Sequence, residues 1–196
     1  MNPLTIGVLG SGKGSNCGAI LEAIADGRLA ETRVGAVISD VPDAGILALA
    51  RQHKVPARHL PPGKFKTKLE PHCEEQLVAL LQKHGVELVV LAGYMRLLKE
   101  PMLAAFPRRI LNIHPSLLPK YPGLQAWKQA LDAGERQAGC TVHLVDGGMD
   151  TGEILAQATV PVLAHDTPET LHARIQAAEH ELYPQVVGWF ASGRVR

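Results

Sequence analysis

The 196-residue sequence has few cysteines and almost no net charge. Its three cysteines, Cys17, Cys73 and Cys140, lie far apart and form no C-x-x-C pair, which argues against a disulfide framework and a cysteine zinc site. A formal net charge of +1 gives no general basic surface for nucleic acids or anionic membranes. The nine histidines show no H-E-x-x-H or other close ligand spacing. We therefore expect no metal, no nucleic-acid partner and no membrane partner.

Long apolar runs and an N-terminal targeting pattern are absent as well. No run approaches the ~20 apolar residues of a membrane helix, and the opening MNPLTIGVLG has no basic start before a long apolar stretch. Together with unpaired cysteines, this favours a cytoplasmic protein. The hydrophobic fraction of 46% and the charged fraction of 20% are ordinary for a globular protein. Because we find no linker or internal repeat, we expect one domain over residues 1–196.

Short apolar segments alternate with segments of helical spacing in the first half of the chain. LTIGVLG (4–10), RVGAVISD (33–40) and VELVVLAG (86–93) are almost continuously apolar, as strands of a parallel sheet covered on both faces must be. The segments of helical spacing are CGAILEAIADG (17–27), AGILALARQH (44–53) and LEPHCEEQLVALLQKHG (69–85). This alternation predicts an α/β fold with a mostly parallel, twisted sheet and helices on both faces.

The second half predicts further strands and a long final helix. The strand-like runs are ILNIH (110–114), GCTVHLV (139–145) and EILAQATVPV (153–162), with a helix at LQAWKQALDAG (124–134). The final helix should begin with Asp166 or Thr167 as its cap and Pro168 in its first turn. Its predicted core stripe consists of Leu171, Ile175, Ala178, Leu182 and Val186.

The segment GSGKGSN (10–16) follows the first strand and opens the first helix. Glycines allow the backbone to approach a ligand closely, and a helix N-terminus offers free N–H groups to an anion. Neither common fingerprint fits, because Gly14 stands where a P-loop needs Ser or Thr, and Ser15 where a dinucleotide motif needs its third glycine. Asp40, at the end of the second strand, keeps a dinucleotide site open. The segment predicts a phosphate site, with a turn that binds nothing as the alternative.

Asn112 and His114 lie two positions apart in a strand-like run, so their side chains share one face. The run ends at the loop PSLLPKYPG (115–123), which contains three prolines. An oriented amide and a group that changes charge near neutral pH suit a carbonyl that becomes an oxyanion. The carboxyl end of a strand is also where open α/β sheets bind ligands. A buried histidine beside a capping asparagine would give the same pattern.

Three other features suggest a functional role only in combination with the motifs above. Asp150, in GGMDTG (147–152), could reach the same sheet edge and favour the charged form of His114, although such a residue alone is more often a turn residue. Residues 92–98 (AGYMRLL) could offer backbone groups to a flat ring, although the segment alone is better explained as an ordinary strand-to-loop transition. Gln176 and Glu179 are neighbours on the final helix beside its apolar stripe, where polar residues are usually solvated.

Five segments together resemble one family in order and spacing. They are GSGKGSN (10–16), LAGYMRLL (91–98), LNIHPSLLPKYPG (111–123), TVHLVDGGMDTGEILAQ (141–157) and IQAAEHELYP (175–184). Over nearly its whole length the chain resembles the phosphoribosylglycinamide formyltransferases, folate enzymes of purine synthesis. The resemblance implies a Rossmann-like formyltransferase fold with an antiparallel strand near the end. It also implies formyl transfer from 10-formyltetrahydrofolate, as co-substrate, to the amine of glycinamide ribonucleotide, by a monomer or homodimer without a metal.

The resemblance further implies roles for individual residues. Asn112, His114 and Asp150 would be catalytic: the first two would stabilise the oxyanion, while the carboxylate would keep the imidazole charged and help to move a proton. The residues implied for the ribonucleotide are Gly14, Ser15, Asn16, Gln176 and Glu179. Those implied for the folate are Lys68, Met95, Arg96, Leu97, Leu98, Asn112, Asp146, Gly147, Gly148, Met149 and Asp150. Lys13 and the segment 125–127 (Gln-Ala-Trp) depart from the family pattern.

Other functions stay open at this point. Methionyl-tRNA formyltransferase and formyltetrahydrofolate hydrolase resemble the chain at Asn-x-His and the later Asp, but they carry a further domain and lack the glycine pattern. An NAD-dependent oxidoreductase would use Gly10, Gly12 and Asp40. A non-catalytic nucleotide-binding module is a third alternative, which any turnover would exclude.

Overall fold

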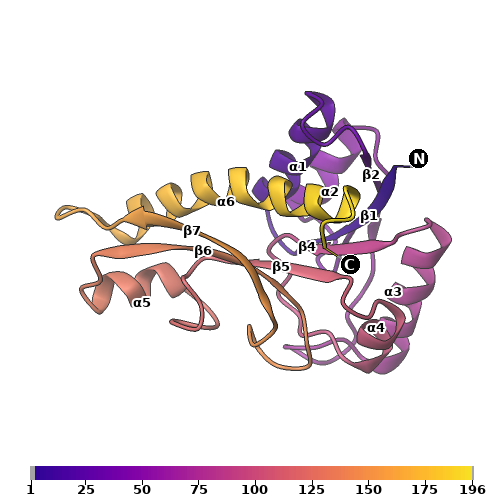
Figure 1. Cartoon of the computed structure of the whole chain (residues 1–196). Helices are drawn as coiled ribbons and strands as arrows, with labels where there is room; N and C mark the ends of the chain where they lie inside the picture. The colour runs from indigo at the N-terminus through magenta and orange to yellow at the C-terminus, as the bar shows by residue number, and fades with distance from the viewer. Residues whose placement is uncertain (1–2, 196) are drawn as a thin grey trace.

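The computed structural model describes residues 3–195 and is built around a seven-stranded sheet (Figure 1). The strand order is β3-β2-β1-β4-β5-β6-β7. The strands are β1 (Leu4–Leu9), β2 (Thr32–Ser39), β3 (Ala57–His59), β4 (Leu88–Leu91), β5 (Ile110–His114), β6 (Gln137–Leu144) and β7 (Ile154–Pro161). The first five pair in parallel, whereas β6 and β7 are antiparallel to their neighbours. The predicted mostly parallel sheet with an antiparallel part near the end is confirmed.

Helices cover both faces of this sheet, as predicted. They are α1 (Ser15–Ala25), α2 (Gly45–Gln52), α3 (Pro71–Lys83), α4 (Glu100–Ala105), α5 (Ala126–Asp132) and α6 (Pro168–Ala191). Figure 1 shows α1, α2 and α6 on one side of the sheet and α3 and α4 on the other. Each side has its own apolar core cluster.

The central strand β4 explains why the apolar runs are continuous. Leu88 and Val90 belong to the cluster beneath α1 and α6, while Val89 and Leu91 belong to the cluster beneath α3 and α4. Successive side chains of a strand point to opposite faces, so a strand covered twice needs apolar residues at every position.

The final helix begins as predicted but buries a different set of residues. The Thr167 side chain accepts a hydrogen bond from the Thr170 N–H, and Pro168 occupies the first turn. Four predicted stripe residues are buried, but Ala178 is only half-buried. Glu179, expected beside the stripe, is 5% exposed and lies in the buried face. The expectation that Glu179 lies beside the buried stripe is therefore wrong, and so is the alternative that it is merely solvated.

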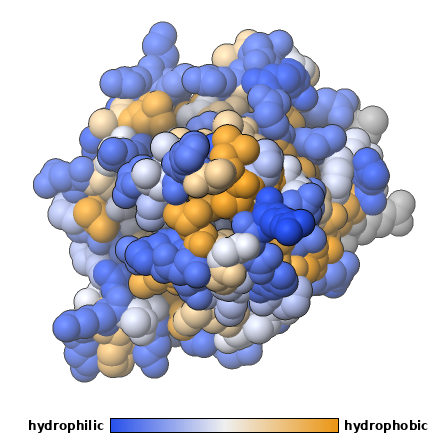
Figure 2. All heavy atoms as spheres, turned by 90° about the vertical axis from the view of Figure 1, so that its left-hand side faces the viewer, coloured by the Kyte–Doolittle hydropathy of each residue, from blue (hydrophilic) through white to orange (hydrophobic). Residues whose placement is uncertain are grey.

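Among the described residues, no helix combines the length and the apolar content needed to cross a membrane. The end of the molecule that carries α5 and the start of α6 exposes apolar areas separated by hydrophilic ones (Figure 2).

The strands β1, β4 and β5 are neighbours, so their carboxyl ends form one edge of the sheet. In open α/β sheets this edge is where ligands bind.

Candidate active site

The structure brings Asn112, His114 and Asp150 together at the end of β5. His114 Nδ1 lies 3.4 Å from Asp150 Oδ2, and the Asn112 amide Nδ2 lies 3.4 Å from Asp150 Oδ1. Asp150 comes from the loop between β6 and β7, where its φ of 55° places the backbone in the left-handed region. Residues 38 positions apart in sequence thus meet, in the arrangement that the resemblance implies.

The contacts of His114 indicate its protonation state. Its Nε2 lies 2.9 Å from the Tyr121 carbonyl oxygen, and a carbonyl can only accept, so this nitrogen carries a proton. The other nitrogen faces the Asp150 carboxylate, which is also an acceptor. A carboxylate at this position favours the form of the imidazole that carries a proton on this nitrogen as well.

Asp150 is held as a carboxylate. Burial by itself raises its pKa, but the hydrogen bond from the Gly123 N–H and the neighbouring His114 hold the pKa below its ordinary value. The Gly123 N–H donates to Oδ2 over 2.9 Å. The carboxylate therefore stays ionised at neutral pH, where it can stabilise a positive imidazole.

His143 is a site residue that the sequence reasoning missed. Its Nδ1 lies 2.8 Å from the Leu144 carbonyl oxygen, so Nδ1 carries the proton and Nε2 is an acceptor. Nε2 then receives a hydrogen bond from Asn112 Nδ2 over 3.1 Å, which orients the amide with its N–H groups toward the site. Asn112 stands opposite His143 in the pairing of β5 with β6, and a single sequence does not reveal that register.

A pocket of about 80 Å³ adjoins these residues. Eight of the residues predicted for the folate line it: Arg96, Leu97, Leu98, Asn112, Asp146, Gly148, Met149 and Asp150. Leu91, Tyr94, His143 and Val145 complete the lining. Met95, Gly147 and Lys68 lie outside it, and the Lys68 ammonium stands 4.7 Å from the centre of the Phe65 ring. The structure thus gathers most of the predicted folate residues but not all.

Asp40 does not have the geometry of a ribose-binding residue. It is 5% exposed, its Oδ1 accepts from the Ser11 hydroxyl over 2.5 Å, and its Oδ2 pairs with Arg96 Nε over 2.7 Å. Arg96 also donates to the Phe65 carbonyl oxygen. Both carboxylate oxygens therefore already have partners within the protein and are not available to a ribose hydroxyl, which argues against the oxidoreductase alternative.

The glycine loop lies at the same sheet edge, because β1 is the neighbour of β4. Gly14 caps α1 with a φ of 84°, and a Cβ there would stand 2.6 Å from Ile46 Cγ1. Glycine is thus required by the fold itself. No side chain caps the helix, so the N–H groups of Ser15 and Asn16 in the first turn have no partner within the helix. They are placed to bind an anion.

Asn16 and Glu179 join this loop to α6. The Asn16 amide donates to Glu179 Oε2 over 2.8 Å, while Asn16 Oδ1 is buried without a hydrogen-bond partner among the described residues. Burial raises the pKa of Glu179 to about 7, despite the hydrogen bond from Asn16. A buried carboxyl group that titrates near neutral pH is a common feature of functional sites. Gln176, one turn away, is half-buried.

A separate group of possible metal ligands lies at the start of α3. The ligand atoms of Glu70, His72 and Cys73 all lie within 4.8 Å of one another. They already pair among themselves, with His72 Nε2 3.3 Å from Cys73 Sγ, and Glu70 also pairs with Lys64. None of them is among the predicted site residues.

Comparisons with known proteins agree with this geometry. The formyl transferase family model matches residues 4–187. The phosphoribosylglycinamide formyltransferase of Escherichia coli is 41% identical over 193 residues, covering 98% of this chain and 90% of that protein. A trifunctional purine biosynthetic protein of Drosophila pseudoobscura is 45% identical over 97% of this chain, which spans only 14% of that protein.

The solved structures confirm the predicted Rossmann-like formyltransferase fold. The crystal structure of glycinamide ribonucleotide transformylase 1 from Symbiobacterium toebii superposes with a TM-score of 0.94 at 51% identity, covering 99% of this chain and 90% of that one. That of phosphoribosylglycinamide formyltransferase from Brucella melitensis gives 0.90 at 44% identity and covers 100% of this chain and 99% of that one. From its sequence and its fold alike, the chain belongs to the formyl transferase family.

Proposed function

We propose that this chain transfers the formyl group of 10-formyltetrahydrofolate to the amine of glycinamide ribonucleotide, a step of purine synthesis. The observation that carries the proposal is the placement of Asn112, His114 and Asp150 between two binding features. On one side is the pocket lined by eight of the predicted folate residues. On the other is a glycine loop that opens a helix, which suits a ribonucleotide phosphate.

The catalytic roles follow from the contacts. The substrate amine attacks the formyl carbon directly, so the reaction needs no protein nucleophile. The Asn112 amide donates to the oxyanion that forms, an interaction worth about 3 kcal/mol for one good donor. The 3.4 Å contact between His114 Nδ1 and Asp150 is long for a hydrogen bond. The Nδ1–H is therefore not committed to Asp150 and can also donate to an oxyanion that forms beside it, while Nε2 stays bound to Tyr121.

Asp150 has two tasks in this scheme. Its carboxylate keeps the imidazole charged, and it takes part in moving the amine's proton toward the departing folate nitrogen. His143 keeps the Asn112 amide in the orientation that donates. The reacting groups thus depend on partners that are themselves fixed by hydrogen bonds.

The binding roles divide between the two substrates. Gly14, Ser15 and Asn16 hold the ribonucleotide phosphate, and Gln176 and Glu179 contact its phosphate and ribose. The residues of the pocket hold the pterin ring, with Met95 and Gly147 at its rim and Lys68 near the folate tail. We further propose that residues 1–196 form one cytoplasmic domain that works as a monomer or homodimer without a metal ion.

A comparison of formyl acceptors tests this function. Loss of 10-formyltetrahydrofolate is followed after addition of glycinamide ribonucleotide, aminoimidazole carboxamide ribonucleotide or charged initiator methionyl-tRNA. We expect turnover with the first acceptor alone. Turnover with the tRNA, or loss of the folate formyl group without any acceptor, would assign the chain to one of the other formyl-folate activities.

A further inference from the structure

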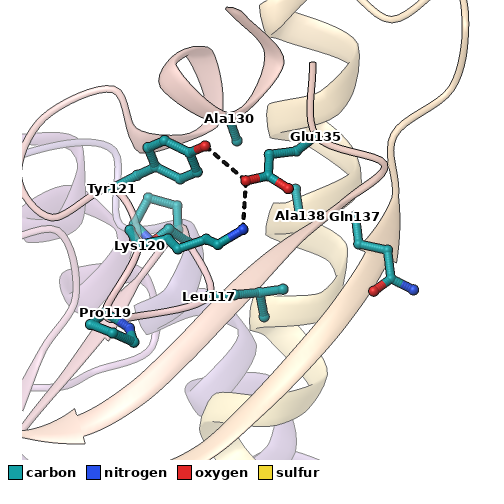
Figure 3. A pocket seen from close by; sticks show the side chains of 10 residues that line it. Leu117, Pro119, Lys120, Tyr121, Ala130, Glu135, Gln137 and Ala138 are labelled. Atoms are coloured by element: carbon teal, nitrogen blue, oxygen red, sulfur yellow. Dashed lines mark hydrogen bonds and ion pairs between the residues drawn. The ribbon is translucent and has the colours of Figure 1, made fainter. Parts of the chain in front are cut away.

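A second, larger pocket lies behind the proline loop 115–123. Its volume is about 260 Å³, and it separates the loop from the end of α5 and the start of β6 (Figure 3). The lining includes Leu117, Pro119, Ala130 and Ala138, whose side chains are apolar. It contains none of the residues proposed above for catalysis or binding.

A charged cluster borders this pocket. The Tyr121 hydroxyl donates to Glu135 Oε1 over 2.8 Å, and the Lys120 ammonium donates to the same oxygen over 2.7 Å. Figure 3 shows both side chains converging on Glu135 across the hollow. The hydrogen bonds from Lys120 and Tyr121 lower the pKa of Glu135, so the acceptor is ionised at neutral pH. Hydrogen bonds to an ionised acceptor are stronger than those between neutral groups.

Tyr121 connects this cluster to the candidate active site. Its carbonyl oxygen receives the His114 Nε2–H over 2.9 Å. Tyr121 is also one of the few residues other than glycine in the left-handed region, with a φ of 56°. Residues other than glycine rarely adopt this backbone conformation, so the surrounding structure must hold Tyr121 in it. The direction of the carbonyl therefore depends on what fixes the rest of the residue.

The two halves of the loop are fixed in different ways. In the first half, the Leu118 N–H donates to the Thr141 hydroxyl, and that hydroxyl donates to the Ser116 carbonyl oxygen. These bonds join the loop directly to β6. In the second half, the Lys120 carbonyl oxygen accepts from the Ser116 hydroxyl and the Gly123 N–H donates to Asp150, on either side of Tyr121. The Tyr121 side chain packs against the core on one side and borders the hollow on the other, where its hydrogen bond to Glu135 restrains it.

We propose that Glu135 is a positioning residue for His114. It holds the Tyr121 side chain, and thereby the carbonyl oxygen that orients the imidazole from the side opposite Asp150. The inference rests on the proposed function only for the catalytic part of His114, because the chain of hydrogen bonds exists whatever the reaction. Glu135 stands outside the substrate pocket and so acts on turnover rather than on binding.

Three single variants and one double variant separate this role from others. Tyr121→Phe removes the hydroxyl but keeps the ring and backbone, and Glu135→Ala removes the acceptor. We expect each to lower kcat about tenfold, the lower range for loss of a partner that orients an active group, with both KM values unchanged. Glu135→Gln keeps an acceptor for the tyrosine and should retain near-normal kcat. The double variant Tyr121→Phe/Glu135→Ala should lose little more than the worse single variant, because both break one connection.

A second readout is independent of turnover. The His114 side chain is 6% exposed, so its Nε2 proton should be observable by NMR. In Tyr121→Phe and Glu135→Ala that signal should move and exchange faster with solvent. Asp132→Ala is the control, because Asp132 lies nearby on α5 in an exposed pair with Lys128. It should change neither kcat nor the signal.

The measurements distinguish a positioning role of the cluster from a purely structural one. If the two variants lower the melting temperature but leave kcat and the His114 signal at the level of Asp132→Ala, the cluster is only structural and the proposal is wrong. Tyr121→Phe decides the matter if Glu135→Ala does not fold. A wild-type chain that does not formylate glycinamide ribonucleotide would overturn the proposed function, whereas the NMR comparison would still test the positioning of His114.

Discussion

His114 and Asp150 differ from an ordinary surface ion pair in their surroundings. Their side chains are 6% and 13% exposed, so water screens the pair far less than it would at the surface. The pKa of Asp150 lies below its ordinary value although burial opposes this. The carboxylate is therefore an ionised group that the fold keeps beside a histidine, and its charge should matter most when charge develops on the substrate.

Removing that charge should affect turnover more than binding. We expect Asp150→Asn to lower kcat on the order of a hundredfold, while both KM values change little, because the lost interaction belongs to the transition state. Steady-state kinetics with each substrate varied in turn measure this. Asp132→Asn makes the same chemical change on the exposed face of α5 and should leave kcat unaltered.

A double variant tests whether His114 and Asp150 act together. The double variant Asp150→Asn/His114→Asn should lose little beyond the worse single variant, since residues that act as a unit are not additive. Losses that multiply instead would show that the two side chains work independently, and the proposed mechanism would then fail.

At the scale of whole elements, α1 and α6 are joined through one buried carboxyl group. Glu179 lies in the buried face of α6 and accepts from Asn16 on α1. Burial raises its pKa to about 7, from 4.5. Between these two pH values the folded chain keeps a proton that the unfolded chain has already lost. Stability from this group is thus fully present below about pH 4.5 and is lost as the pH rises through about 7.

Glu179→Gln should remove this pH dependence. The amide resembles the protonated acid, so the variant should gain stability relative to the wild type as the pH rises from about 5 to 8, by at most about 3 kcal/mol. Thermal unfolding at several pH values measures the difference. Glu181→Gln is the matched control, because the Glu181 side chain is 83% exposed on the same helix. If both variants show the same trend with pH, Glu179 is not the group responsible.

The sequence predicted best those elements in which burial determines the residue type at almost every position. The strands β1, β2 and β4 are covered on both faces and therefore read as apolar runs. The strand β3 and the helix α4 were missed because they have three and six residues, too few to show a period. Glu179 was misplaced for another reason. The helical pattern in the sequence separates polar from apolar residues, so it assigns a carboxyl group to the solvent-facing side even when the group is buried with a partner on another helix.

The candidate site shows the same division between local and long-range information. The positions of Asn112 and His114 follow from the period of one strand. The roles of Asp40 and His143 depend on partners far away in the chain, Arg96 for the first and Asn112 for the second. A single sequence carries no direct sign of such pairings. The Gly14 position could be predicted as glycine-dependent, but its contact with Ile46 could not.

At the scale of the whole molecule, the strand order itself assembles the site. The neighbouring strands β1, β4 and β5 bring the glycine loop, residues 96–98 and Asn112 to one edge. The loop that joins the antiparallel strands β6 and β7 then brings Asp150 to Asn112 and His114. Both proposed substrates would therefore contact parts of the chain that come together only on folding, so each should stabilise the whole fold.

This link between binding and folding gives the last prediction. A ligand that binds only the folded chain stabilises it by about 2.7 kcal/mol at a concentration 100 times its Kd. For a chain of this length, that raises the melting temperature by roughly 5–10 °C. We expect such shifts with glycinamide ribonucleotide and with an unreactive analogue of 10-formyltetrahydrofolate, measured by differential scanning calorimetry. NAD should give none, because both oxygens of Asp40 are already bound by Ser11 and Arg96. Stabilisation by NAD without any by the folate analogue would instead favour a dinucleotide site at the glycine loop, and the assignment of the sheet edge to two substrates would have to be withdrawn.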